Sequence, residues 1–344
     1  MGRPRDGKGK DSRLMKSRYR RTTTWLLAGV ALLTASEAQP QAPPPQPPLL
    51  AVTPTGEQGL GEVPWAELTY SAHKFLLGAE TVIRVARLPA KTLAEALPTP
   101  PVGRPVSPRG TEAVTVLVTS DLPFGRDETV KVFLDPATGA AIGGEKTMLG
   151  RSAYHKFLRY TEGGLYTWRS SPANDRETTL PPESWTRRKE YLVAPSVRPA
   201  PGTPVLDSYA LIYLVTAARL DHRGSGLRLV MLADDRYVEM NFVAGGLTYR
   251  RVSFEEVWPG GSGHRRGDVL VRTVRATARA LGATESSEDV ELGFLGMRGA
   301  LTIYLEVGTG LPVALSGRVK HIGEVAVRLD RALLKGAPAT DLAP

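Results

Sequence analysis

The sequence predicts a mainly β protein, in which a curved antiparallel sheet forms a half-barrel-like meander with one main helix packed on it. In many short segments apolar residues alternate with polar ones, which is the period of a strand with one buried face. Glycine, proline and aspartate turn signals separate these segments, and one segment shows helical spacing instead. Consecutive hairpins of this kind build an antiparallel meander, whose open side an apolar helix can cover.

The first half of the sheet is predicted from three sets of alternating apolar residues. They are Ala66, Leu68, Tyr70 and Ala72; Val114, Val116 and Val118; and Val130, Val132 and Leu134. Residues 89–110 interrupt this pattern, because they are rich in proline and contain only a brief helical turn at residues 91–97. We interpret them as a surface insertion between two strands.

The second half repeats the pattern around further turns. The predicted strands and turns are Leu227, Leu229 and Met231; a turn at Asp234-Asp235; Val238, Met240 and Phe242; a turn at Gly245-Gly246; Leu301, Ile303, Leu305 and Val307; a turn at Gly308-Thr309-Gly310; Leu311, Val313 and Leu315; and a final strand over residues 323–329. Residues 260–267 are predicted to be an irregular loop.

The main helix is predicted to begin after Asp207-Ser208, because these side chains cap free N–H groups at a helix start. Leu211, Ile212, Leu214, Val215 and Ala218 then recur at helical spacing. Residues 221–224 are expected to end the helix, with Gly224 at the C-terminal stop.

The N-terminal region has the three parts of an export signal. Nine basic residues precede residue 22, the apolar run WLLAGVALLTA follows, and Ser36-Glu37-Ala38 offers a small-x-small cleavage site. The run is about half as long as a spanning helix of roughly 20 residues, so we expect cleavage rather than a membrane anchor. Arg20-Arg21 also fits a twin-arginine signal, but Thr22-Thr23-Thr24 favours the general export route.

These features predict the domain organisation. We expect a signal peptide at residues 1–38, a proline-rich linker at 39–64, a single β-rich envelope domain at 65–335 with a proline-rich insertion at 89–110, and a flexible tail at 336–344. The expected location is the periplasm or the extracellular medium. No spanning segment is expected after cleavage of the signal peptide.

Charge and cysteine content exclude several classes of function. The net charge of +9 arises mostly from the leader, because the chain after Arg21 carries 35 basic and 33 acidic residues. A nearly neutral domain lacks the basic footprint of a nucleic-acid-binding protein. The chain has no cysteine, which excludes disulfides, thiolate metal sites and a lipoprotein anchor.

The search for catalytic, metal and cofactor motifs finds none. The five histidines have no metal-ligand spacing. Gly261-Ser262-Gly263-His264 does not fit a nucleophile elbow or a dinucleotide fingerprint, and we interpret it as a flexible hairpin loop. Asp234-Asp235 has too few oxygens for calcium, and Glu255-Glu256 point to opposite faces of a strand. We therefore predict no catalytic residue, no metal and no cofactor.

Two small basic clusters remain, Arg187-Arg188-Lys189 and Arg265-Arg266. Such clusters can contact anionic lipid headgroups or lipopolysaccharide phosphates. With Glu183 and Glu190 close in the sequence, we interpret them as ordinary solvated charge.

Four sequence segments together resemble domain-of-unknown-function family 3108, a family of exported proteins of Gram-negative bacteria. They are residues 68–85 (LTYSAHKFLLGAETVIRV), 132–139 (VFLDPATG), 206–220 (LDSYALIYLVTAARL, after Pro201-Gly202) and 301–329. The closing hairpin within residues 301–329 also resembles that of lipoprotein-carrier folds, where a curved antiparallel sheet wraps a helix. The resemblance implies an envelope location and an apolar concave face, and it assigns no catalytic role.

Three functions stay open. The leading hypothesis is a non-enzymatic envelope protein that binds a hydrophobic ligand, such as a lipid or acyl chain, or a partner protein. Its candidate ligand-binding residues are Leu211, Leu214, Leu229, Met231, Met240 and Phe242, each of which also suits a place in the core. The alternatives are a hydrolase or carbohydrate-active enzyme assembled from distant residues, and a structural envelope protein. The oligomeric state is open.

Overall fold

The computed structural model describes residues 50–52, 60–74, 77–122, 125–150, 152–233, 235–283, 290, 292, 296–320 and 322–336. The predicted signal peptide, the run PQAPPPQPP of the predicted linker and the tail from residue 337 lie outside the described residues. All described residues belong to one compact unit, Gln46–Pro344.

The predicted fold class is confirmed, since a 16-stranded, mainly antiparallel sheet dominates this unit. The strands are β1 (Leu50–Val52), β2 (Trp65–Lys74), β3 (Leu77–Pro89), β4 (Glu112–Leu122), β5 (Arg126–Leu134), β6 (Ala141–Met148), β7 (Tyr154–Thr161), β8 (Gly164–Ser171), β9 (Arg187–Val193), β10 (Val205–Leu206), β11 (Ser225–Ala233), β12 (Arg236–Trp258), β13 (Gly261–Ala280), β14 (Met297–Glu306), β15 (Pro312–Val319) and β16 (Gly323–Leu334). The helices are α1 (Ala90–Ala96), α2 (Leu211–Ala217) and the short 3-10 turns η1 (Glu177–Thr179), η2 (Pro182–Ser184) and η3 (Ser208–Ala210).

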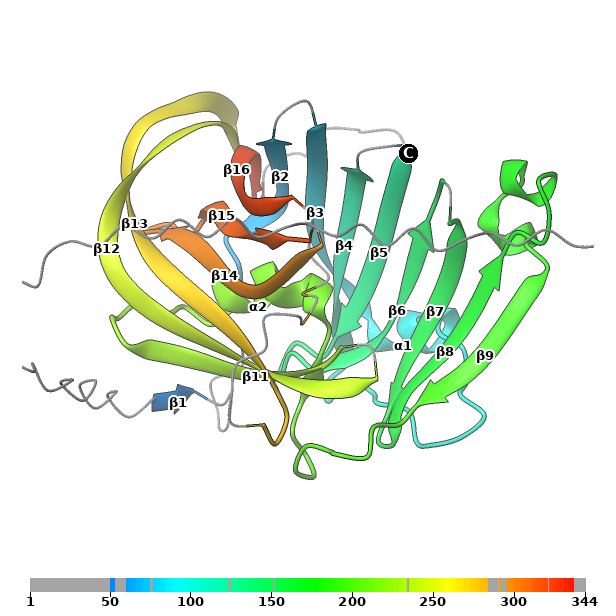
Figure 1. Cartoon of the computed structure of the whole chain (residues 1–344). Coiled ribbons are helices and arrows are strands. Elements are labelled where there is room, and N and C mark those ends of the chain that lie inside the picture. Colours follow the sequence, from blue (N-terminus) through cyan, green and yellow to red (C-terminus); the bar gives the residue numbers. More distant parts are fainter. Residues whose placement is uncertain are drawn as a thin grey trace, which may run out of the picture. The chain divides into compact units, whose positions relative to one another are not determined.

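Two meanders make up the sheet (Figure 1). Strands β2 to β9 pair in sequence order, as do β11 to β16, and the antiparallel pair β16–β2 joins the two sets. β9 is therefore the last strand on one side of the sheet.

The hairpin β12–β13 closes part of the sheet into a ring. Its far end turns back so that Glu255 and Val257 of β12 pair in parallel with Arg331 and Leu333 of β16. The carboxylate of Glu255 accepts a hydrogen bond from Arg331 Nε at 3.1 Å. Strands β12 to β16 thus form a closed circuit of pairings, visible where the long hairpin curls over in Figure 1.

The predicted turn at Gly245-Gly246 is wrong. β12 runs through both glycines and only shifts its register against β13 between Ala244 and Leu247. A β-bulge bends a strand without ending it, which is why two adjacent glycines occur here. A Cβ on Gly245 would lie 2.5 Å from Oγ1 of Thr273 on β13, so a larger residue at this position requires the Thr273 side chain to move.

The predicted irregular loop at residues 260–267 is also wrong. The chain turns at Pro259-Gly260, and Gly261 already begins β13. Ladder pairing with β12 imposes a strand on residues 261–267, although their glycines weaken the local preference for one. The final strand is also longer than predicted and continues to Leu334, because β2 and β12 pair with its second half.

The predicted helix is present, but it ends earlier than expected. Asp207 accepts a hydrogen bond from the N–H of Tyr209 at 3.0 Å, which caps η3 and leads into α2. All seven residues of α2 are buried, as expected for a helix that is apolar on every side. The left-handed residue directly after the helix is Arg219, with φ of 46°, whereas Gly224 lies later, at the end of the turn into β11.

One large core surrounds α2, with side chains from both meanders packed against it. Figure 1 places α2 between β14–β15 and β3–β4. A smaller cluster, made by Leu93, Leu97, Ala113, Phe133 and Ile142, packs α1 against the sheet. The insertion at residues 89–110 therefore contributes Leu93 and Leu97 to the interior as well as a surface loop.

Packing begins before Trp65, the expected first residue of the domain. Val63 is buried, and Leu60 packs against the core. β1, within the predicted linker, pairs in parallel with β11. Among the described residues, no helix has the length and apolar character that a membrane crossing requires.

Candidate ligand-binding site

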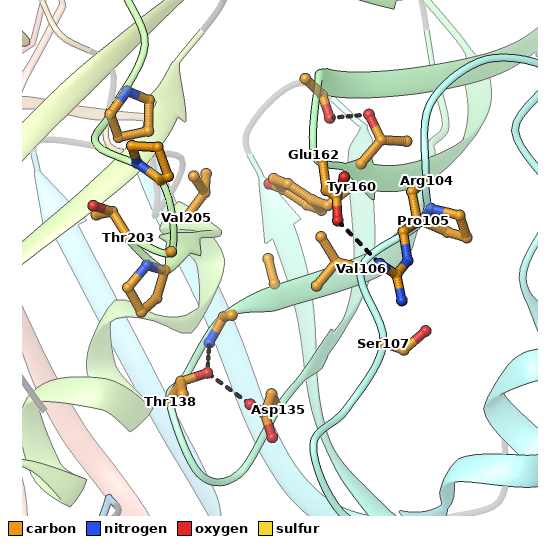
Figure 2. Close-up of a pocket in the computed structure, with 18 of the residues that line it drawn as sticks. Arg104, Pro105, Val106, Ser107, Asp135, Thr138, Tyr160, Glu162, Thr203 and Val205 are labelled. Atoms are coloured by element: carbon orange, nitrogen blue, oxygen red, sulfur yellow. Dashed lines mark hydrogen bonds and ion pairs between the residues drawn. The ribbon is translucent and has the colours of Figure 1, made fainter. Parts of the chain in front are cut away.

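A cavity of about 740 Å³ lies where loops from three parts of the chain meet (Figure 2). One wall is the strap, which we define as residues 198–204 between β9 and β10. The facing wall is the loop of residues 104–109 from the proline-rich insertion, and the turn after β5 closes one end. We call this cavity the strap pocket. Its volume falls within the range of roughly 300–1,000 Å³ that is typical of small-molecule sites.

Both walls have a physical reason to keep their shape. The strap carries Pro199, Pro201 and Pro204, and each proline ring restricts φ. The opposite loop is tied to β7 by backbone hydrogen bonds from Val106 N to Tyr160 O at 2.9 Å and from Glu162 N to Arg104 O at 3.0 Å. Val106, Val205 and Tyr160 provide apolar surface between the two walls.

The turn after β5 is held by Asp135. Its Oδ2 accepts from Thr138 Oγ1 at 2.7 Å, and its Oδ1 accepts from the N–H of Ala137 at 3.3 Å. Gly139 in this turn has φ of 73°, and a Cβ there would lie 2.7 Å from Cδ2 of Leu214 in α2. The turn, and with it one end of the pocket, is thus fitted directly against the helix.

Three arginines stand at the rim of the strap pocket, and all three are exposed: Arg104, Arg109 and Arg198. Arg104 lies 3.8 Å from the carboxylate of Glu162. The pocket therefore combines apolar surface with polar side chains and a rim of arginines, a lining that suits a ligand with an apolar body and a polar or anionic group.

Behind Tyr160 lies a buried carboxyl group. The Tyr160 hydroxyl donates to Oδ2 of Asp207 at 3.0 Å. Burial raises the pKa of Asp207, although the bonds from Tyr209 N–H and the Tyr160 hydroxyl and the charge of Lys146 oppose this. Burial also raises the pKa of Tyr160 well above its usual range. This pair links the pocket wall to the cap of the helix.

A buried ion pair lies beside this carboxyl group. Nζ of Lys146 on β6 is 2.5 Å from Oε1 of Glu128 on β5, and the Tyr209 hydroxyl donates to the same carboxylate at 2.9 Å. Burial lowers the pKa of Lys146, but the charges of Tyr209 and Glu128 outweigh it and the net shift is upward. These contacts show that η3 packs on the face of the sheet that carries Lys146, which we call the inner face.

The six candidate ligand-binding residues all lie in the large core around α2. Of these six, only Leu229 lines one of the described cavities, a smaller space of about 290 Å³ on the other side of the strap. Thr138, Pro199, Ala200, Thr203 and Pro204 line both this space and the strap pocket. The structure therefore brings Leu229 to a cavity and places Leu211, Leu214, Met231, Met240 and Phe242 in packing contacts.

Sequence reasoning missed the strap and the loop at residues 104–109 as walls of a cavity. Alternation of apolar residues reports which side chains face a core, and neither loop alternates. The available signal was the run RPAPGTP directly before the helix cap, because stiff proline-rich loops beside a rigid sheet are frequent binding elements.

The carboxylates among the described lining residues of the strap pocket already have partners. They are Asp135, used by its own turn, and Glu162, paired with Arg104. Elsewhere, Oγ of Ser253 and Nε2 of His264 lie 2.9 Å apart across the β12–β13 hairpin, but both residues are exposed. Within the described residues no carboxylate orients His264, as a catalytic triad requires. The same residues hold no group of three or more potential metal ligands.

No family model matches this chain, and no curated protein matches it. Among solved structures, it is similar to a crystallised beta-barrel-like protein of domain of unknown function DUF1849 from Brucella abortus. The two chains are 12% identical, the match covers 80% of this chain and 99% of the other, and the TM-score is 0.39.

Proposed function

We propose that this protein is a non-enzymatic, exported envelope protein that binds a small amphiphile in the strap pocket. The supporting observation is the cavity of about 740 Å³, whose walls are partly apolar and whose rim carries three arginines. Membership of domain-of-unknown-function family 3108, cleavage of the leader and a periplasmic or secreted location belong to the same proposal.

Binding rather than catalysis is the better account of the pocket. A hydrolase needs a nucleophile or a pair of carboxyl groups directed at one bond. The carboxylate of Asp135 instead accepts hydrogen bonds from the Thr138 hydroxyl and from the N–H groups of Ala137 and Arg109. The apolar lining and the stiff strap suit a site that is formed before its ligand arrives.

Native mass spectrometry of the chain purified from the periplasm tests this proposal, and we expect a co-purifying lipid-like molecule. Thr203→Trp places an indole between the two cavities and is expected to abolish the bound mass. Val197→Trp is the matched control, because Val197 is 54% exposed just before the strap and is not among the described pocket residues. A chain that carries no ligand and binds no added amphiphile contradicts the proposal.

A further inference from the structure

Four cations form a continuous row across the last four strands of the sheet. In the strand register Lys146 of β6 lies opposite Lys156 of β7, Lys156 lies opposite Arg169 of β8, and Arg169 lies opposite Lys189 of β9. Directly paired residues point to the same face. Since Lys146 contacts Glu128 and Tyr209, the whole row lies on the inner face. We call these four residues the cation row.

Such a row is unfavourable for the fold on its own. Side chains directly opposite each other have Cβ atoms about 5 Å apart, and like charges at that spacing destabilise a sheet. Glu128 balances Lys146 at one end. Further along, Lys156 and Arg169 both lie over the ring of Tyr154, at 4.7 and 4.5 Å from its centroid, and Lys189 lies over Tyr191. These ring contacts fix the direction in which the three cations point.

Sheet geometry changes the interpretation of the basic cluster at residues 187–189. Glu190 lies on the opposite face of β9, where its carboxylate accepts from Tyr166 at 2.7 Å. Strand alternation puts Arg187 on the inner face with Lys189, and Arg187 and Arg169 line a further cavity of about 360 Å³. Hydroxyl and amide groups of Ser152, Ser171, Asn174 and Thr178 line it too, together with Asp175.

The same face becomes apolar between the cation row and the strap pocket. Leu158, Thr167 and Tyr191 lie in one row across β7, β8 and β9, and Tyr160, Leu165 and Val193 lie in the next. Lys156 and Tyr160 are four positions apart on β7, which is about 13 Å along a strand. A cationic end, an apolar stretch and the strap pocket thus follow each other on one surface.

We infer that the cation row binds the phosphate headgroup of an anionic amphiphile whose apolar part lies along the inner face toward the strap pocket. This inference rests on the proposed function and specifies its ligand class. Lysine and arginine form strong charge-assisted hydrogen bonds with phosphate oxygens, and neighbouring cations of the row can share one phosphate group. The stretch of Leu158, Leu165 and Val193 requires the ligand to be an amphiphile rather than a free anion.

Calorimetric titration of the full chain tests the inference with three probes. They are an alkyl phosphate, an alkyl maltoside of equal chain length, and inorganic phosphate. We expect the alkyl phosphate to bind at least about tenfold more tightly than the maltoside, a preference that falls as salt rises. Lys156→Gln/Arg169→Gln/Lys189→Gln is expected to remove this preference, while Lys156→Arg/Arg169→Lys/Lys189→Arg keeps it.

The matched control is Arg236→Gln/Arg251→Gln/Arg266→Gln, which removes the same charge from exposed positions on the β12–β13 hairpin and leaves the leader unchanged. This control should bind like the natural chain. Equal affinity for both detergents overturns the headgroup site and leaves the proposed function standing. If inorganic phosphate binds as tightly as the alkyl phosphate, the inference that the ligand is an amphiphile is wrong. Failure of every amphiphile to bind rejects the proposed function itself.

Discussion

Lys156 of β7 and Arg169 of β8 lie directly opposite each other in the sheet, and both cations lie over the same ring, that of Tyr154. Two like charges in directly opposed positions lower the stability of an isolated sheet. A ligand that carries negative charge is attracted to both cations, which connects this part of the sheet to the proposed function.

Neutralising the centre of the cation row should stabilise the unliganded protein. Arg169 lies between Lys156 and Lys189, so Arg169→Gln removes two like-charge pairs. We expect a gain of about 0.5 kcal/mol at low salt, which is roughly 1–2 °C in Tm, and less at high salt because ions screen the charges. Thermal unfolding at two salt concentrations measures it. Arg169→Lys, which keeps the charge, should show no gain; an equal gain in both variants contradicts the prediction.

Replacing Lys146, at the other end of the cation row, should destabilise the protein. Lys146→Met removes the partner of Glu128, whose side chain is only 8% exposed, and leaves a buried carboxylate without its cation. Breaking a buried pair typically costs about 3 kcal/mol or more, so urea titration should show a loss of that size. The double variant Lys146→Met/Glu128→Leu should recover most of the loss. A double variant as unstable as the single one shows that Lys146 acts through packing instead.

The carboxyl group of Asp207 should make stability depend on pH. Burial raises its pKa in the folded protein above the value in the unfolded chain, so the folded state holds the proton more tightly. The contribution of Asp207 to the free energy of unfolding is therefore complete below the pKa that this group has in the unfolded chain. It is lost as pH rises through the pKa that the group has in the folded protein.

Asp207→Asn removes this dependence, because an amide stays neutral while its oxygen still accepts from Tyr209 N–H. The variant should gain stability relative to the natural chain as pH rises from acid to neutral. Urea titrations of both proteins across that range measure the difference. If the two proteins differ in free energy of unfolding by the same amount at every pH, the pKa of Asp207 is not raised.

Gly139 of the turn after β5 and Gly202 of the strap form a matched pair for testing how closely that turn fits against α2. Gly139 and Gly202 both have positive φ, so alanine at either position costs about 1 kcal/mol of backbone strain. Only at Gly139 does a Cβ also meet Leu214, at 2.7 Å, whereas nothing lies within 4 Å of one at Gly202. Gly139→Ala should therefore lose about 1–3 kcal/mol more in urea titration than Gly202→Ala. Equal losses show that the turn can move away from the helix.

The local pattern of apolar and polar residues predicted most of the strands and the main helix. Val114, Val116 and Val118 alternate because one face of β4 is buried, and all three are buried in the structure. Asp207 predicted the helix start, because a cap is a contact between near neighbours in sequence. The predictions that failed at Gly245-Gly246 and residues 260–267 concern places where ladder pairing within the β12–β13 hairpin overrides the local preference of glycine for turns.

The sequence by itself determined that this chain folds as a curved, mainly antiparallel sheet with one buried helix, since period and caps depend on neighbouring residues. Only the tertiary structure decided which loops enclose the strap pocket and which charges share a face. Lys146, Lys156, Arg169 and Lys189 belong to four strands, and their alignment depends on the register of three strand pairs. Register is set by packing across the whole sheet, so a shift of one residue would send these cations to opposite faces.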